Sequence, residues 1–489
     1  MNSFLEKTRS SKGSPGYHPP VSAATRGVLP PGPKGSLIKG NLTSFQRDPL
    51  GFMTKCAREY GDVAAFRFVN VRGCFLSHPD HVESVLATNY RQFKKGRALQ
   101  MTRRIFGNGL LTSEGDFWLR QRRLAQPAFH KGRIEAYGQV ITDYTNQMLG
   151  GWRDGQRVDL HDAMMRLTLR IVGKTLFDAE VAEESNAVNE AVSVFMDQFV
   201  GLRSLARRLV PQSIPTPGNR RYWRAVKNLN KIIYGIIARR RESGKDSGDL
   251  LSMLLAARDE DGSRMTDEQL RDEVLTLFLA GHETTAVALT WTLYLLSLHP
   301  ESEARLLDEL DNAFEGRPPE VQDMPRLSYT ERVVKESMRL YPPAYVLGRE
   351  ALTNFKIGGF DIPARTQVLM SPWVIQRDPR FYADPERFNP DRWTDDFVRQ
   401  LPRFAYFPFG GGPRQCIGNS FAMMEVELVL ATIAQRFRLQ FPAGEKMTPS
   451  PTFTLRPNTK ARFHAVERPR LPQWPSGSVC SSGGPAPEG

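Results

Sequence analysis

The longest hydrophobic pattern in the chain runs from Leu270 to Leu298 and leaves almost no polar face. Thr266 and Gln269 have the spacing of a capping box, so they predict a helix start just ahead of this pattern, and Pro300 predicts its end. At 1.5 Å per residue the helix would be roughly 45 Å long. A helix this long and this apolar must run through the core of the protein.

Shorter patterns predict further elements, most of them helical. They are a helix from Pro49 to Tyr60, a hairpin of strands 63–69 and 72–77, a helical region from about 157 to 241 that prolines interrupt at 211–218, and helices at 300–314 and 328–340.

The chain ends are polar and differ from the rest. Residues 1–28 are rich in Ser, Gly and Pro and predict a disordered arm, which ends at the stiff segment 29–33. Residues 469–489 predict a disordered tail. The arm contains no apolar segment of the kind found in signal peptides or anchors, and no run of 18 apolar residues occurs anywhere. We therefore expect no transmembrane anchor and a cytoplasmic location.

Composition is that of a soluble protein, with 40% hydrophobic and 24% charged residues among 489. Length alone suggests two or three domains. The net charge of +13 favours a negatively charged partner, although a merely basic surface explains it equally well. No nucleic-acid motif accompanies the basic runs at 220–224 and 239–241, so we expect no nucleic acid partner. Four cysteines without C-x-x-C spacing exclude a zinc site and fit a reducing compartment.

A polar patch interrupts the long helix at Ala280-Gly-His-Glu-Thr284. Polar groups in the middle of a buried helix cost stability unless they are paired, so they indicate function. Gly281 would allow close approach of a ligand. The Thr284 hydroxyl can bond the Ala280 carbonyl and open the helix locally. The alternative is a hydrogen-bonded kink with no chemical role.

A glycine-rich turn at 409–418 places Cys416 just ahead of another apolar, helical segment. Free N–H groups at a helix start stabilise a thiolate, which is a metal ligand or a nucleophile. Glycines let the turn approach a flat partner closely. A surface turn with an inert cysteine is the alternative interpretation.

This turn resembles the haem-binding signature of the cytochrome P450 family, F-x-x-G-x-R-x-C-x-G. The matching positions are Phe409, Gly412, Arg414, Cys416 and Gly418. Four further family motifs follow the family's order over roughly residues 29–466: W-x-x-x-R at 118–122, A-G-x-E-T at 280–284, E-x-x-R at 336–339 and P-D-R-W at 390–393. The resemblance implies one catalytic domain at 29–468 that is mainly α with small β-sheets (α+β). In it, haem b lies between the long helix and the cysteine loop.

The resemblance also implies roles for individual residues. Cys416 would be the axial ligand of the haem iron, with Ala280 and Gly281 on the opposite side and Glu283 and Thr284 delivering protons to bound dioxygen. Trp118, Arg122, Arg349 and Arg414 would hold the haem edge and its propionates. Glu336 and Arg339 would form a buried pair completed by Arg392, for which Arg387 is the alternative. Pocket walls would come from Ala344, Val346, Leu347 and Phe453, and a lid from the region of Phe195, Phe199 and Leu202.

The activity implied is a monooxygenase that hydroxylates or epoxidises a lipophilic molecule such as a fatty acid, terpenoid or steroid. Electrons would come from NAD(P)H through a separate ferredoxin or flavoprotein reductase, docked on a basic face that includes Arg120 and Arg123. A monomer is expected. Three alternatives stay open: a peroxygenase or isomerase that needs no reductase, a haem sensor or carrier, and a helical scaffold in which the motifs are incidental.

Overall fold

A computed structural model describes residues 29–196, 214–258, 262, 264–458 and 460–469. The expected arm at 1–28, the lid residues Phe199 and Leu202, and the tail from 470 onward lie outside the described residues.

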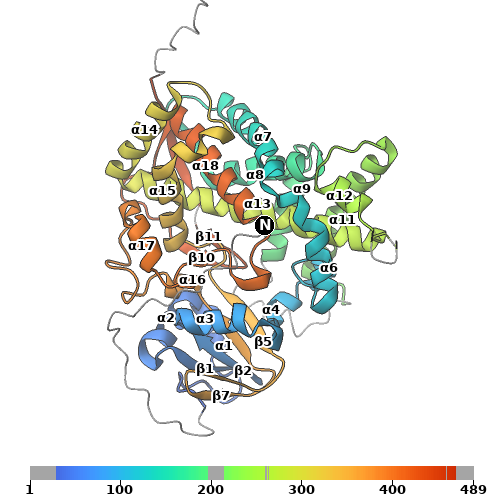
Figure 1. Ribbon diagram of the computed structural model, residues 1–489, viewed down its shortest axis with the longest axis vertical. Coiled ribbons are helices and arrows are strands. Elements are labelled where there is room, and N and C mark those ends of the chain that lie inside the picture. The colour runs from blue at the N-terminus through green and yellow to red at the C-terminus, as the bar shows by residue number, and fades with distance from the viewer. Residues whose placement is uncertain (1–28, 197–213, 259–261, 263, 459, 470–489) are drawn as a thin grey trace, which may run out of the picture.

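Helices make up most of the described chain (Figure 1). The longer ones are α2 (Pro49–Tyr60), α6 (Gly115–Ala125), α7 (Lys131–Gly150), α8 (Leu160–Phe177), α9 (Ser185–Met196), α11 (Pro217–Ser243), α13 (Asp267–Leu298), α14 (Pro300–Phe314), α15 (Ser328–Leu340) and α18 (Asn419–Arg436). Short helices are α1 (Leu42–Arg47), α3 (Pro79–Glu83), α4 (Arg97–Gln100), α5 (Arg103–Phe106), α12 (Leu250–Ala256), α16 (Pro372–Ile375) and α17 (Asp395–Gln400). Single 3-10 or π turns are η1 (Ser84–Thr88), η2 (Tyr90–Gln92), η3 (Gln126–Phe129), η4 (Val321–Arg326), η5 (Pro390–Arg392) and η6 (Gly412–Arg414).

Strands gather into small sheets. The largest has the order β1-β2-β8-β5-β3, and the others have the orders β4-β12-β9, β10-β11 and β6-β7. Their bounds are β1 (Val63–Phe68), β2 (Val71–Leu76), β3 (Phe93–Lys95), β4 (Gln156–Asp159), β5 (Leu347–Ala351), β6 (Phe355–Ile357), β7 (Phe360–Ile362), β8 (Gln367–Met370), β9 (Phe437–Gln440), β10 (Pro449–Pro451), β11 (Leu455–Pro457) and β12 (Arg462–Glu467). In the largest sheet β2 and β8 are parallel and the other neighbours are antiparallel.

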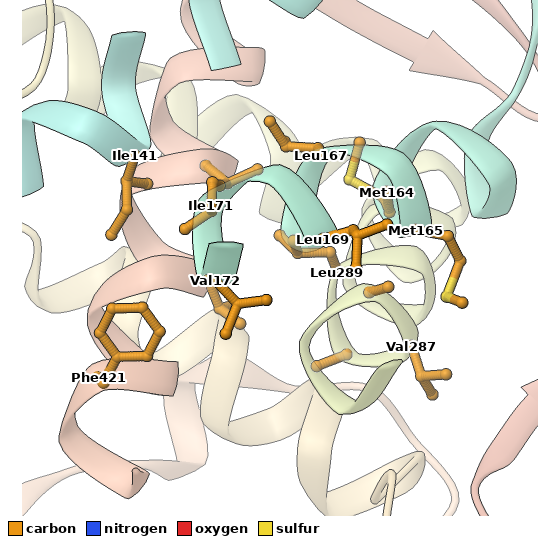
Figure 2. Packing of buried hydrophobic residues seen from close by; sticks show 14 of the residues in the cluster. Ile141, Met164, Met165, Leu167, Leu169, Ile171, Val172, Val287, Leu289 and Phe421 are labelled. Carbon is orange, nitrogen blue, oxygen red and sulfur yellow. The ribbon is translucent and has the colours of Figure 1, made fainter. Parts of the chain in front are cut away.

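The main core lies among α7, α8, α13 and α18. Figure 2 shows Ile141 of α7, Val172 of α8, Leu289 of α13 and Phe421 of α18 in this core, and all four are buried. In Figure 1 the long helices fill the upper part of the molecule, while β1, β2 and α1 lie at its lower end. None of the helices in the described ranges is long and apolar enough to cross a bilayer.

Helix α13 is the central element. It has 32 residues and begins with the predicted capping box, in which the Thr266 hydroxyl accepts from the Gln269 N–H and the Gln269 side chain accepts from the Thr266 N–H. At 1.5 Å per residue its length is about 48 Å. Nearly all of its side chains are buried, so it can bring residues of its middle turns to the interior.

Several predictions from the sequence are confirmed. The fold is mainly helical with small sheets, α2 has the predicted bounds, and β1 and β2 form the predicted hairpin. The Asp48 carboxylate caps α2 by accepting from the Gly51 N–H at 2.9 Å.

The prediction of helix from about 157 onward is wrong at two places. Residues 156–159 form β4, because this segment pairs with β12, where Arg157 lies opposite His464. The chain also leaves the helical conformation after α8, since Asp178 takes a left-handed conformation with φ of 44° and the next helix begins only at Ser185.

Candidate functional site

The cysteine turn is shaped by its glycines. Gly410 and Gly412 have φ of 69° and 68°, a region that favours glycine. A Cβ at Gly412 would lie 1.9 Å from the Leu86 carbonyl oxygen, so η6 can approach η1 only without a side chain there. The Cys416 N–H donates to the Phe409 carbonyl at 3.0 Å and closes the turn. Cys416 is thereby fixed immediately before α18, and part of the residue is exposed.

The Cys416 thiol favours a proton in the absence of a cation. Surrounding protein raises its pKa, whereas the Gly418 N–H and the Arg122 charge act in the opposite direction. Burial therefore outweighs the N–H effect expected from the sequence. A metal cation at the sulfur would supply the missing compensation, because thiols that bind metals lose their proton.

Three cations lie together close to this turn. Arg414 pairs with Glu114 and lies over the Trp118 ring, 4.9 Å from its centroid. Arg349 on β5 and Lys95 on β3 complete the group, and repulsion from Arg414 contributes to lowering the pKa of both. Burial is the larger cause, and it lowers the pKa of Lys95 to about 7 and that of Arg349 to about 10.

This cluster has more positive than negative charge. Glu114 forms the one ion pair that Arg414 makes among the described residues, and the Nε and Nη1 atoms of Arg414 are buried there without a hydrogen-bond partner. Buried donors are normally paired, so these two nitrogens of Arg414 indicate a binding site for an anionic ligand. A haem, whose two propionates are anionic, fits this cluster beside Cys416. Lys95 was missed in the sequence because nothing near it in the chain distinguishes it from a solvated lysine.

Helix α6 covers the turn from another side. Trp118 is buried, and the Arg122 Nη1 donates to the Gln415 carbonyl at 2.8 Å. Arg122 therefore contacts the cysteine turn in this structure, next to the cation cluster where the resemblance expected it to hold a propionate. Its neighbour Arg123 is exposed.

The buried stretch of α13 is interrupted by an exposed residue in the middle of the helix. Ala280 is exposed although the residues on its N-terminal side are buried, and the Thr284 Oγ1 donates to the Ala280 carbonyl at 2.6 Å, as the sequence suggested. His282 is buried, and its Nε2 lies 2.9 Å from the Met165 carbonyl. Burial lowers the pKa of His282 to about 3, so this ring is neutral and donates.

Gly281 has a different surrounding from the one expected. A Cβ at this position would lie 3.0 Å from Val172 Cγ2 on α8. The missing side chain thus lets α13 pack closely against α8, and the approach of a ligand to Gly281 stays a prediction.

Glu283 is held by residues from the end of the chain. Its Oε1 accepts from Arg456 Nε at 2.6 Å and from Thr454 Oγ1 at 2.5 Å, and only 4% of the residue is exposed. Thr284 and Glu283 are adjacent in sequence but hydrogen-bond to different partners.

Near the start of α13, Asp272 and Glu273 anchor the segment ahead of α6. Asp272 Oδ2 accepts from the Asn108 N–H at 2.6 Å, and Glu273 Oε2 accepts from the Leu110 N–H at 2.9 Å. Burial, followed by repulsion from Asp272, raises the pKa of Glu273 to about 8.

Glu425 of α18 is a second buried carboxyl on the core side, next to Thr285, and burial holds its pKa well above the usual range. Neither Glu273 nor Glu425 stands out in the sequence, because both look like solvated positions of amphipathic helices.

Glu336 and Arg339 on α15 are fully buried and form a network with the segment that follows α16. The Glu336 carboxylate accepts from Arg339 Nε and Nη2, Arg392 Nε, Trp393 Nε1 and the Asn389 N–H, all between 2.8 and 3.0 Å. Of the two candidate arginines, Arg392 reaches Glu336, whereas Arg387 contributes its carbonyl to Arg339.

The expected pocket residues Ala344, Val346, Leu347 and Phe453 are all half-buried. The Phe453 ring contacts Phe195 of α9 with centroids 5.5 Å apart, and Phe195 contacts Phe106 of α5 at the same distance. Phe195 also lines a small apolar pocket with Ile105 and Leu279, the neighbour of Ala280. An aromatic wall thus extends from the β10–β11 turn toward the middle of α13.

Comparison with known proteins identifies the family of this chain. The family model of cytochrome P450 matches residues 30–464. Cyclooctat-9-en-7-ol 5-monooxygenase of Streptomyces melanosporofaciens is 38% identical over 86% of this chain and 91% of its own length. Pentalenene oxygenase of Streptomyces avermitilis is 35% identical over 93% and 97% of the two chains. The solved structure of retinoic acid bound cyanobacterial CYP120A1 superposes with a TM-score of 0.81, 26% identity, and coverage of 90% of this chain and 99% of that one.

The fold and the cysteine turn define a haem-thiolate oxidoreductase. The chain belongs to the cytochrome P450 family, and its activity is that of a P450 monooxygenase acting on a lipophilic molecule with electrons from a redox partner.

Proposed function

We propose that this monooxygenase hydroxylates or epoxidises a terpenoid. The two Streptomyces relatives are named for oxidation of cyclooctat-9-en-7-ol and pentalenene. The aromatic wall of Phe106, Phe195 and Phe453 supports an apolar substrate, because aromatic rings favour binding of hydrocarbon surface. Ala344, Val346 and Leu347 would form the wall next to the cation cluster, since Arg349 follows them on β5.

The haem would be held by the cysteine turn and by the cation cluster beside it. Cys416 would ligate the iron, and Arg414, Arg349 and Lys95 would bind the propionates. Trp118 packs under Arg414, while Phe409, Gly412 and Gly418 shape the turn, and Arg122 fixes it through Gln415. When bound, haem supplies reductive activation of O₂ and transfer of one oxygen atom to the substrate.

Thr284 and Glu283 would transfer protons on the side of the site that lies opposite Cys416. The Thr284 Oγ1 proton points to the Ala280 carbonyl, and rotation of this hydroxyl would present it to the face on which Ala280 is exposed. Glu283 would resupply that proton only after its carboxylate leaves Arg456. Arg456 would therefore act as a positioning residue for the acid.

Electrons would come from NAD(P)H through a separate ferredoxin or flavoprotein reductase in the cytoplasm. The buried free thiols of Cys56 and Cys74 are consistent with a reducing compartment. The docking face would lie over the cysteine turn, where α6 exposes Arg123. Charge reversal of Arg123 should raise the apparent KM for an acidic redox partner at low salt, and an unchanged value would remove this residue from the docking face.

The assignment of Cys416 is tested by the carbon monoxide difference spectrum of the reduced protein. We expect a strongly red-shifted Soret band in wild type and its loss in Cys416→Ser. Terpenoids can then be screened by the change in spin state on binding. A wild-type protein without this band, or a band that the substitution leaves in place, would refute the haem-thiolate site. Product formation with peroxide alone would favour a peroxygenase.

A further inference from the structure

The turn at residues 36–40 exposes two large aliphatic side chains. Leu37 is 95% exposed and its neighbour Ile38 is 80% exposed, the highest values among the large hydrophobic residues that the structure describes. Leu29 and Val69 are also exposed. Single exposed apolar residues are common on protein surfaces, but two adjacent ones at a protruding turn suggest an interaction site.

Hydrogen bonds fix this turn in place. Ser36 and Gly40 exchange backbone hydrogen bonds of 3.0 and 2.9 Å, and the Val69 N–H donates to the Lys39 carbonyl at 3.1 Å. Arg67 Nη2 donates to the carbonyls of Ser36 and Leu37, both at 2.8 Å. The turn is thus attached to the end of the β1–β2 hairpin, and its apolar side chains point away from the fold without a core to cover them.

A conformational requirement at Gly40 reinforces this attachment. Its φ is 59°, and a Cβ there would lie 2.1 Å from the Arg67 carbonyl oxygen. The turn is therefore held in one conformation, and binding through Leu37 and Ile38 would not have to order a flexible loop.

The chain segments next to the turn are basic. Segments 29–47 and 63–76 contain five cations and no carboxylate: Lys34, Lys39, Arg47, Arg67 and Arg72. Arg67 and Arg72 lie directly opposite each other on β1 and β2, an arrangement that destabilises a strand pair. None of the described carboxylates forms an ion pair with any of these five cations. An anionic partner would relieve this repulsion.

We infer that the 36–40 turn docks this enzyme on an anionic lipid surface, with Leu37 and Ile38 inserted among the acyl chains and the surrounding cations at the headgroups. A protruding apolar tip ringed by cations matches a bilayer interface, which needs no complementary pocket. A second copy of the chain is disfavoured, because two basic patches repel each other. Docking would keep the enzyme where lipophilic molecules dissolve, although the inference does not depend on which substrate is oxidised.

The test is co-sedimentation of the full-length haem protein with vesicles. We expect binding to vesicles of phosphatidylcholine with one-third phosphatidylglycerol, and weak binding to phosphatidylcholine alone. Leu37→Asp with Ile38→Asp should lower the partition coefficient at least about thirtyfold, because two aliphatic side chains lose their burial. Lys34→Glu with Lys39→Glu should lower it by a similar factor, on the order of thirtyfold, and remove the preference for phosphatidylglycerol.

A matched control keeps the experiment specific. Leu298→Asp with Val398→Asp replaces two half-exposed aliphatic residues elsewhere on the surface and should leave partitioning unchanged. Each variant must retain the carbon monoxide band of wild type, which reports an intact fold. The inference fails if wild type stays in the supernatant with anionic vesicles, or if the control pair weakens binding as much as the Leu37 and Ile38 pair. It also fails if light scattering shows a dimer that only the Leu37 and Ile38 pair disrupts, since the turn would then be a contact between copies.

Discussion

Arg456 on β11 reaches across the fold to bind Glu283 in the middle of α13, with 2.6 Å between Nε and Oε1. The carboxylate is 5% exposed and the guanidinium 18% exposed, so water screens this pair only weakly.

Substitution Arg456→Gln should therefore destabilise the protein. Glu283 would remain buried with Thr454 as its neutral partner, and we expect a loss of about 2 kcal/mol in the free energy of unfolding. Denaturant unfolding of the haem-bound protein measures this loss. Arg399→Gln is the control, since it removes an exposed ion pair on α17 and should cost less than about 0.5 kcal/mol. Equal losses in the two variants would contradict a special role of the Arg456 pair.

Substitution of each of the two arginines near Glu336 should have a very different effect on the free energy of unfolding. Arg392→Ala removes a donor to a fully buried carboxylate and should cost about 3 kcal/mol or more, with loss of bound haem as the fold loosens. Arg387→Ala should stay within about 0.5 kcal/mol, because its exposed side chain is not needed for the carbonyl that Arg339 uses. The haem content and melting temperature of the two purified variants decide between them.

Glu273 should make stability depend on pH. Its pKa is raised to about 8 in the folded protein, while an unfolded chain gives it a value near 4.5. Between these values the folded state binds the extra proton, so this group's contribution to stability is present below pH 4.5 and is lost as pH rises through 8.

Glu273→Gln keeps an acceptor for the Leu110 N–H but cannot ionise. We therefore expect the variant to be more stable than wild type at pH 8, by on the order of 2 kcal/mol, and to match it at about pH 5. Urea unfolding at both pH values checks this result. A constant difference across the range would show that Glu273 does not titrate in this window.

Gly281 should be coupled energetically to Val172. Gly281→Ala gains helix propensity of about 1 kcal/mol but requires Val172 to move, so we expect a nearly unchanged melting temperature. Combined with Val172→Ala, the new methyl group would fit, and the double-mutant cycle should give a coupling of about 1 kcal/mol. An additive cycle together with a shifted haem spectrum would instead indicate that Gly281 serves the ligand.

Local signals in the sequence sufficed for the elements with strong caps. Thr266 with Gln269 marked the start of α13, and Asp48 with Pro49 marked that of α2, because capping depends on residues close in the chain. The spacing of Arg414 and Cys416 identified the cysteine turn for a similar reason, since its geometry is contained in one short segment.

Features that depend on distant contacts were missed. Gln156–Asp159 is a strand only because β12 is beside it, and the helical pattern that continues into α8 concealed this. Lys95 and Glu114 belong to the site only because β3 and α6 bring them to Arg414. The role of Arg456 was equally hidden, since no residue near β11 in the chain indicates that its partner is Glu283.

The pairing of β12 with β4 has a consequence for biosynthesis. Register partners His464 and Arg157 are separated by most of the chain, so β4 cannot take its place in the sheet until β12 has left the ribosome. Thr454 and Arg456 arrive equally late to neutralise the buried acid of α13. The segments that form β4 and α13 therefore lack these partners until residues 454–467 have been synthesised, so the helical core must stay without them during much of elongation.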